Sequence, residues 1–169
     1  MNRKLHYWGA CVCILPVMIM IGSGLLLLLK GESDWVQPAT VRGQAGEPSL
    51  SMDTILRITR SIEQMEVSSW SDINRLDVRP SKGVIKVRGN NHWELQLDHI
   101  SGESLQLAYR RSDTIESIHD GTFFADWAKL WLFLPASLIL MALSMTGVYL
   151  FVQPMMARRR KRLRLAARA

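Results

Sequence analysis

The chain has 169 residues, a formal net charge of +6 and an apolar fraction of 48%. This length fits one modest domain with membrane anchors and excludes two large independent cores. All fifteen acidic residues lie between Glu32 and Asp126, and the stretches Leu5–Leu29 and Leu130–Ala157 contain no Lys, Arg, Asp or Glu. Because the basic excess is confined to the two ends, nucleic acid is not expected as a partner.

The first apolar run predicts a transmembrane helix over residues 8–29, preceded by a short basic tail over residues 1–7. Twenty-two helical residues span about 33 Å, which exceeds a hydrocarbon core of about 30 Å. A cleaved signal peptide is the alternative. The run is longer than the usual ~7–15 residues and no Ala-x-Ala site follows, so an uncleaved anchor is favoured. Cys11 and Cys13 fall inside this helix, where cysteine packs as a small apolar residue.

The second apolar run predicts a transmembrane helix over residues 127–153, with Trp127, Trp131 and Tyr149 near its ends, as in aromatic belts. A basic tail over residues 154–169 follows. The two tails together carry nine basic and no acidic residues, which predicts that both termini are cytoplasmic and the middle is outside. In a bacterium this means a two-pass protein of the inner (plasma) membrane with a periplasmic central domain. The basic tail is expected to contact anionic membrane lipid, with nucleic acid as the less favoured alternative.

Between the spans, residues 30–49 are rich in Gly, Pro and small polar residues and predict a linker, and residues 50–122 predict a folded domain. Ser51 is placed to cap a helix. The helix would carry an apolar stripe at steps of three and four residues, made of Ile55, Ile58, Ile62 and Met65.

The period then changes to two residues, which is typical of β-strands. A turn at residues 80–83 separates the first two strands, and the third alternates as a half-buried strand. A short helix, Asp113–His119, follows the fourth strand. The apolar strand positions are Ile73, Leu76 and Val78, then Val84, Ile85 and Val87, then Trp93, Leu95 and Leu97, then Leu105, Leu107 and Tyr109. We therefore predict a membrane-anchored α+β fold in which two transmembrane helices flank a domain with one helix packed on an antiparallel β-meander.

Five short patterns in this order resemble the PepSY domain and the PepSY-associated transmembrane family, of which this chain would be a small two-span member. They are Leu5-His6-Tyr7-Trp8-Gly9, Ser23-Gly24-Leu25, Asp98-His99-Ile100-Ser101-Gly102, Ile118-His119-Asp120-Gly121 and Thr146-Gly147-Val148. The resemblance implies a PepSY-like domain on the outer side of the membrane. Larger members of the family carry four spans and two such domains, so this chain corresponds to at most half of such a unit.

Candidate site residues come from the same resemblance. His6 and His119 match family positions, and some relatives resemble ferric-siderophore reductases that carry haem between their helices. Because the two histidines lie at opposite mouths of a bilayer of about 30 Å, they would ligate haem b only in an oligomer or complex. The other interpretation makes both interfacial histidines. His92 and His99 are expected in turns or at the surface.

No catalytic motif and no metal-ligand spacing is present, so the chain is not expected to be an enzyme. The carboxylates Glu63, Glu66 and Asp72 predict a solvated face. The leading hypothesis is a non-enzymatic inner-membrane protein that presents a periplasmic PepSY-like binding or regulatory module, without a cofactor, to a protein partner or a second copy. An exposed sheet edge would suit an extended chain. The alternatives are an accessory subunit of an iron-uptake or siderophore-reductase-type redox system, and a structural subunit of a larger complex.

Overall fold

The computed structural model describes the backbone of residues 3–166 and the side chains of residues 13–149 and 151–156. The chain forms two compact units. One contains Met1–Gly22 and Ile118–Ala169, and the other contains Ser23–Ser117. The side chains of His6 and Cys11 and most of the basic tail lie outside the described residues.

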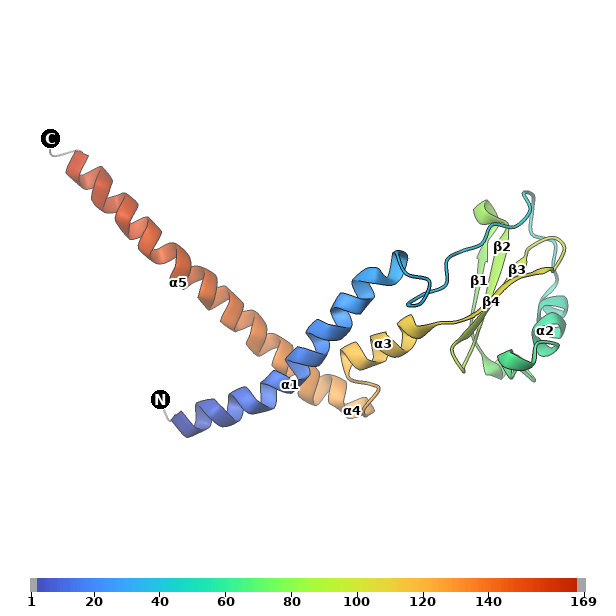
Figure 1. Cartoon of the computed structure of the whole chain (residues 1–169), viewed down its shortest axis with the longest axis horizontal. Helices are drawn as coiled ribbons and strands as arrows, with labels where there is room; N and C mark the ends of the chain where they lie inside the picture. The colour runs from blue at the N-terminus through green and yellow to red at the C-terminus, as the bar shows by residue number, and fades with distance from the viewer. Residues whose placement is uncertain (1–2, 167–169) are drawn as a thin grey trace. The chain divides into compact units, whose positions relative to one another are not determined.

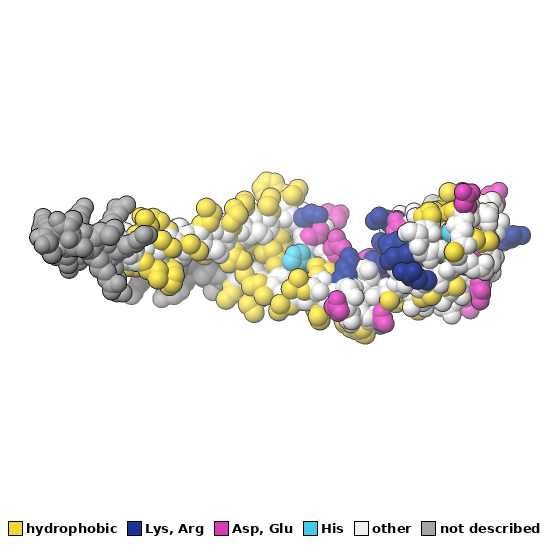
Figure 2. Space-filling model, turned by 90° about the horizontal axis from the view of Figure 1, so that it is seen from above, with side chains coloured by type: hydrophobic (Ala, Val, Ile, Leu, Met, Phe, Trp, Pro, Cys, Tyr) yellow, Lys and Arg dark blue, Asp and Glu magenta, His cyan; other side chains and the backbone are white. Residues whose placement is uncertain are grey.

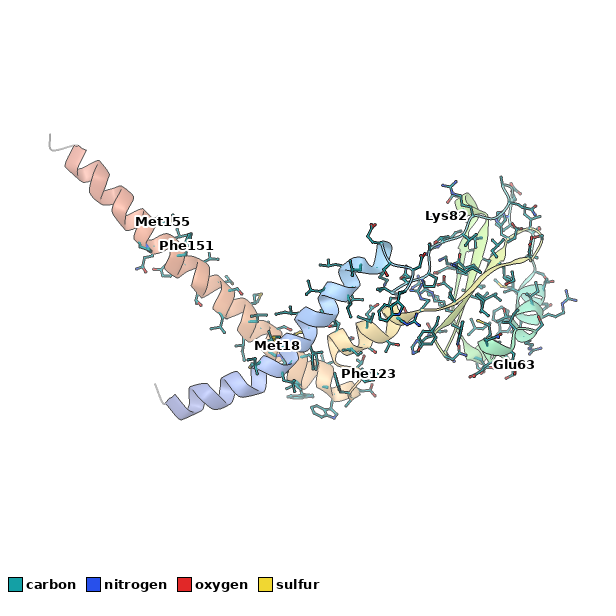
Figure 3. The ribbon with its side chains drawn as sticks, in the orientation of Figure 1. Met18, Glu63, Lys82, Phe123, Phe151 and Met155 are labelled. Atoms are coloured by element: carbon teal, nitrogen blue, oxygen red, sulfur yellow. The ribbon has the colours of Figure 1, made fainter. Side chains whose placement is uncertain are left out.

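The first unit is helical. It contains most of α1 (Arg3–Leu28), the end of α3 (Arg111–Asp120), α4 (Asp126–Ala128), the π-helical segment η5 (Lys129–Phe133) and α5 (Leu134–Ala166). Within it, the Ser137 hydroxyl of α5 donates to Met20 Sδ of α1 at 3.1 Å. Cys13–Gly31 and Asp126–Met156 are long and apolar enough to cross a membrane. Figure 2 shows that apolar side chains dominate the surface of the helical part, and Met18, Phe151 and Met155 are among those exposed (Figure 3).

The second unit is built on one four-stranded antiparallel sheet whose strands follow chain order, β1-β2-β3-β4. Short 3₁₀ turns punctuate the chain around it. The strands are β1 (Ile73–Arg79), β2 (Val84–Gly89), β3 (Trp93–Asp98) and β4 (Ser104–Tyr109), and the turns are η1 (Leu29–Gly31), η2 (Glu63–Met65), η3 (Trp70–Asp72) and η4 (Pro80–Lys82). Lys82 lies in the β1–β2 turn and Glu63 just beyond the helix α2 (Figure 3).

One face of the sheet is apolar and is covered by α2 (Met52–Arg60). The Ser51 hydroxyl caps this helix by accepting a hydrogen bond from the Thr54 backbone N–H at 3.2 Å, as the sequence predicted. Ile55 and Leu56 of α2 are buried against strand residues, which are Ile85, Val87, Leu95 and Leu97. The helix ends earlier than its predicted stripe, and Met65 enters the core from η2.

The opposite face is covered by an irregular segment, residues 34–44, which we call the strap (Figure 1). The strap belongs to the segment predicted to be a linker, yet side chains of β3 bind its backbone. Gln96 does so twice: its Oε1 accepts from Val41 N–H at 2.9 Å and its Nε2 donates to the Ala39 carbonyl at 2.8 Å. The Asp98 carboxylate accepts from Gln44 N–H at 2.6 Å.

Two glycines meet where the strap crosses the β1–β2 turn. Gly43 N–H donates to the Lys82 carbonyl at 3.0 Å. A Cβ on Gly43 would collide with the carbonyl oxygen of Gly83, and Gly83 itself has φ of 70°, which favours glycine. A side chain at residue 43 would therefore hold the strap away from the turn.

The prediction that β3 is half-buried is wrong, because the strap covers its polar face. The side chains expected in solvent are instead enclosed, with relative exposures of 1% for Glu94, 0% for Gln96 and 1% for Asp98. His99 follows β3 in a turn, one of the two positions expected for it, and its side chain is 0% exposed. Alternation identified the two faces correctly, but it carried no sign that chain backbone covers the polar one.

Candidate functional site

A buried ionic network occupies the polar face of the sheet beneath and beside the strap. At its centre Glu94 Oε1 accepts from Lys86 Nζ at 2.9 Å, and Glu94 Oε2 accepts from Arg110 Nη1 at 2.7 Å. Arg110 is 2% exposed and also donates to the Gln37 side-chain oxygen in the strap at 3.0 Å. Strands β2 and β3 and the residue before α3 are thus joined through the carboxylate of Glu94, and Arg110 links this centre to the strap.

The network extends across the sheet to β1. Arg88 bridges two carboxylates, with nitrogen–oxygen distances of 3.3 Å to both Asp77 and Glu94. Asp77 is shared further, with Arg75 at 2.8 Å and Arg79 at 3.8 Å. One carboxylate on β1 therefore serves three guanidinium groups.

Burial and pairing shift the pKa values of these groups in opposite directions. Burial lowers the pKa of Lys86, and the hydrogen bond and charge of Glu94 only partly offset it. For Arg110, burial is outweighed by the hydrogen bonds and charges of Asp113 and Glu94, which raise its pKa. Burial raises and Arg110 lowers the pKa of Asp113, with a net lowering. Glu94 and Asp113 thus hold Arg110 charged at any physiological pH.

The two edges of the sheet differ in chemistry. Both edge strands contain a register shift, but β1 also carries charged side chains, which discourage pairing with another strand. Strand β4 reads Ser-Leu-Gln-Leu-Ala-Tyr, with no charge and no proline. Of the two edges, β4 is the one open to a further strand.

The ladder geometry shows which backbone groups of β4 face outward. Arg110 N–H donates to the His92 carbonyl at 2.9 Å, so by antiparallel alternation the N–H and C=O groups of Leu107 and Tyr109 point away from β3. Within the described residues, none of these outward groups has a hydrogen-bond partner. The edge therefore presents two unpaired donor–acceptor pairs at about 7 Å spacing.

An aromatic and cationic stack flanks the end of this edge. The Arg111 guanidinium lies 5.0 Å from the Trp35 ring centroid and 5.7 Å from that of Tyr109. Tyr109 also packs edge-on against Trp93 and His92, at 5.8 and 6.1 Å between centroids. Arg111 donates to the Trp35 carbonyl at 3.2 Å, so the strap and β4 are fixed relative to each other here.

The two histidines predicted as haem ligands in an oligomer or complex lie on different helices. His119 lies half-buried in the last turn of α3 and has interactions with its neighbours. His6 lies in α1, and its side chain is outside the described residues. Among the residues that are described, no group of three His, Cys, Asp or Glu side chains could hold a metal ion.

The carboxylates predicted to form a solvated face divide into two kinds. Glu63 and Glu66 are exposed as expected. Asp72 instead caps a turn, because its carboxylate accepts from the backbone N–H groups of Ser68 and Ser69, each at 2.8 Å. These hydrogen bonds lower the pKa of Asp72 to about 2.

The arrangement of two apolar helices and a sheet-and-helix domain can now be compared with known proteins. The family described as the PepSY-associated TM region matches residues 3–168. The chain belongs to this family. It is accordingly a membrane protein, with a PepSY-associated region over its whole length. No curated protein and no solved structure gave a significant match.

One family-like motif of this PepSY-associated chain has a clear structural role. In Asp98-His99-Ile100-Ser101-Gly102, Asp98 Oδ1 accepts from the N–H groups of Ile100 and Ser101 at 2.9 and 2.8 Å. Gly102 has φ of 76°, which completes the turn. Since Asp98 Oδ2 also binds the strap, the motif closes the turn and anchors the strap with one side chain.

Sequence reasoning missed the network of the PepSY-associated chain, but a signal was present. Lys86 and Arg88 alternate on one strand, and Glu94 lies at the register position opposite Arg88 on the next. Opposite charges facing each other across a hairpin indicate paired rather than merely solvated side chains. No comparable signal marks the strap residues Gln37 and Val41.

Proposed function

We propose that this protein is a non-enzymatic, two-pass membrane protein that presents its sheet domain outside the cytoplasm as a binding module. The observation that carries the proposal is the uncharged edge strand β4 with its unpaired backbone groups, whereas the opposite edge strand, β1, is charged. The module would take an extended segment of a protein partner, which adds to the sheet as a fifth strand. Both termini would be cytoplasmic, and in a bacterium the module would lie in the periplasm of the inner membrane.

The surroundings of β4 define the partner segment. Backbone pairing to Leu107 and Tyr109 would supply affinity irrespective of sequence. On the apolar face the added strand would continue the row that ends in Leu107, and on the polar face it would continue the row that ends in Gln106. An extended segment with alternating apolar and polar residues suits these two rows.

The test compares the two edges in the full-length protein in detergent. An array of unstructured octapeptides with alternating apolar and polar residues is probed with the wild type and with Leu107→Pro. Proline at residue 107 removes an outward N–H without removing a ladder hydrogen bond. Peptide binding is expected to fall at least tenfold, with the β-sheet signal in circular dichroism retained.

Two further variants keep the test decisive. Val78→Pro places proline on the β1 edge and is expected to leave peptide binding within twofold of the wild type. Leu105→Lys adds a charge to β4 without altering the backbone and is expected to weaken binding. Equal loss in Val78→Pro and Leu107→Pro, or no peptide bound by the wild type, would contradict the proposal. A Soret absorbance band in the purified protein would contradict the absence of a cofactor.

A further inference from the structure

The ionic network contains more cations than carboxylates. Five cations are joined through three carboxylates, and the cations remain in excess even when Lys86, whose pKa burial lowers, is left out. The cations are Arg75, Arg79, Lys86, Arg88 and Arg110, and the carboxylates are Asp77, Glu94 and Asp113. Figure 2 shows Lys and Arg side chains gathered on this domain.

A polar pocket of about 250 Å³ lies at the edge of this network, and its lining includes two of the arginines and two carboxylates. Its lining is Asn74, Arg75, Arg88, Gly89, Asn90, His92, Asp113 and Glu116. The volume is below the roughly 300–1,000 Å³ of sites for drug-sized molecules, so the ligand it fits is small. The pocket lies on the polar side of the sheet and shares only His92 with the surroundings of the β4 edge.

The sheet side of the pocket offers donors with capacity to spare. Arg75 is 60% exposed and uses only its Nε, which donates to Asp77 at 2.8 Å. Its two terminal nitrogens have no partner within the described residues. Arg88 is 15% exposed and is already held in place by Asp77 and Glu94. A guanidinium pair of this kind, one free and one fixed, suits bidentate binding of a carboxylate.

The helix side of the pocket carries the opposite charge. Asp113 and Glu116 come from α3. Glu116 is 64% exposed, and its one charged contact among the described side chains is with Lys30 at 3.8 Å. These carboxylates would repel a simple anion such as phosphate. They would attract an ammonium group on a ligand whose carboxylate is bound by the arginines.

From this division of charge we propose that the pocket binds a small zwitterion with the chemistry of a free α-amino acid. The ligand carboxylate would pair with Arg75 and Arg88, and its ammonium group with Glu116 and Asp113. The site is separate from the β4 edge and does not depend on peptide binding there.

Isothermal titration of the full-length protein in detergent tests this site with L-alanine and L-glutamine, and with acetate, methylammonium and inorganic phosphate as single-charge probes. At least one amino acid is expected to bind ten times or more tightly than any single-charge probe. Arg75→Gln and Glu116→Gln are each expected to weaken amino-acid binding at least tenfold. Both side chains are mostly exposed, so these variants are expected to fold.

Arg57→Gln, on the exposed side of α2, is the matched control and is expected to leave the titration unchanged. Phosphate or acetate binding as tightly as the amino acids, with Glu116→Gln neutral or favourable, would overturn the zwitterion in favour of a simple anion. Failure of both amino acids to bind at millimolar concentration would overturn the site altogether. Neither result would alter the outcome of the Leu107→Pro experiment.

Discussion

The two faces of the four-stranded sheet are both buried, but by opposite means. The apolar face meets α2 through side chains such as Leu95 and Leu97, each 0% exposed, whose contacts are short-ranged and non-directional. The polar face meets the strap through directed hydrogen bonds, in which Gln96 and Asp98 accept from backbone N–H groups of the strap, and ion pairs within the sheet lie beside them. The comparison shows that this small domain encloses the centre of its charged layer, at Lys86, Glu94 and Arg110, as completely as its apolar core.

The largest expected loss of stability comes from substitutions of two neighbouring residues on the opposite faces of β3. Glu94→Gln leaves Lys86 and Arg110 buried without their shared charge, and it is expected to lower the free energy of unfolding by about 3–5 kcal/mol. Leu95→Ala, the adjacent residue on the other face, is expected to lower it by about 2–5 kcal/mol. Urea titration of the full-length protein in detergent, followed by tryptophan fluorescence, measures both. A loss below about 1 kcal/mol for Glu94→Gln would mean that the polar layer is not truly enclosed.

The second expected effect is a dependence of stability on pH. It distinguishes the two faces because the buried carboxylates lie on the polar face. Burial raises the pKa of Asp98, but the N–H groups of Gln44, Ser101 and Ile100 outweigh it and lower the pKa from 3.8 to about 2. The stability it contributes is therefore complete above pH 4 and is lost as the pH falls towards 2. Asp98→Asn is expected to reduce the slope of the free energy of unfolding against pH in this range. The reduction corresponds to at most one proton taken up on unfolding. An unchanged slope would show that Asp98 does not hold the strap.

The smallest expected change in stability concerns the buried side chain of His99, which lies in the turn after β3. Both ring nitrogens of His99 are buried without a hydrogen-bond partner among the described residues. His99→Leu removes that penalty and is expected to raise the free energy of unfolding by about 1 kcal/mol. His92→Leu, at a half-buried position with φ of 67°, serves as the control and is expected to give no gain. A lower free energy of unfolding for His99→Leu would contradict this prediction and would indicate that the ring nitrogens of His99 are hydrogen-bonded in solution.

The sequence predicted the apolar half of this comparison well. Periods of three to four and of two residues placed α2 and all four strands, and Ser51 and Gly83 marked a cap and a turn. These signals are local, because each depends on residues close together in the chain. The family resemblance of the chain was also confirmed over residues 3–168.

The polar half could not be read in the same way. Val41 and Gln96 are 55 positions apart, and the hydrogen bond between them uses a backbone group that every residue other than proline possesses. A strap bound through its backbone therefore leaves no periodic pattern in its own sequence. The alternation of apolar and polar residues along β3 therefore assigns Glu94 and Asp98 to solvent. This pattern shows which residues share a face, but it does not show what covers that face.

The strap comes before the sheet in the chain, and this order has a consequence for synthesis. When residues 34–44 leave the ribosome, their partners Gln96, Asp98 and Arg110 do not yet exist. The covering segment must wait, unstructured, until more than fifty further residues are made, and the last partner arrives just before the second apolar stretch begins. Closure of the domain and completion of the membrane anchor would therefore fall within the same short interval of translation.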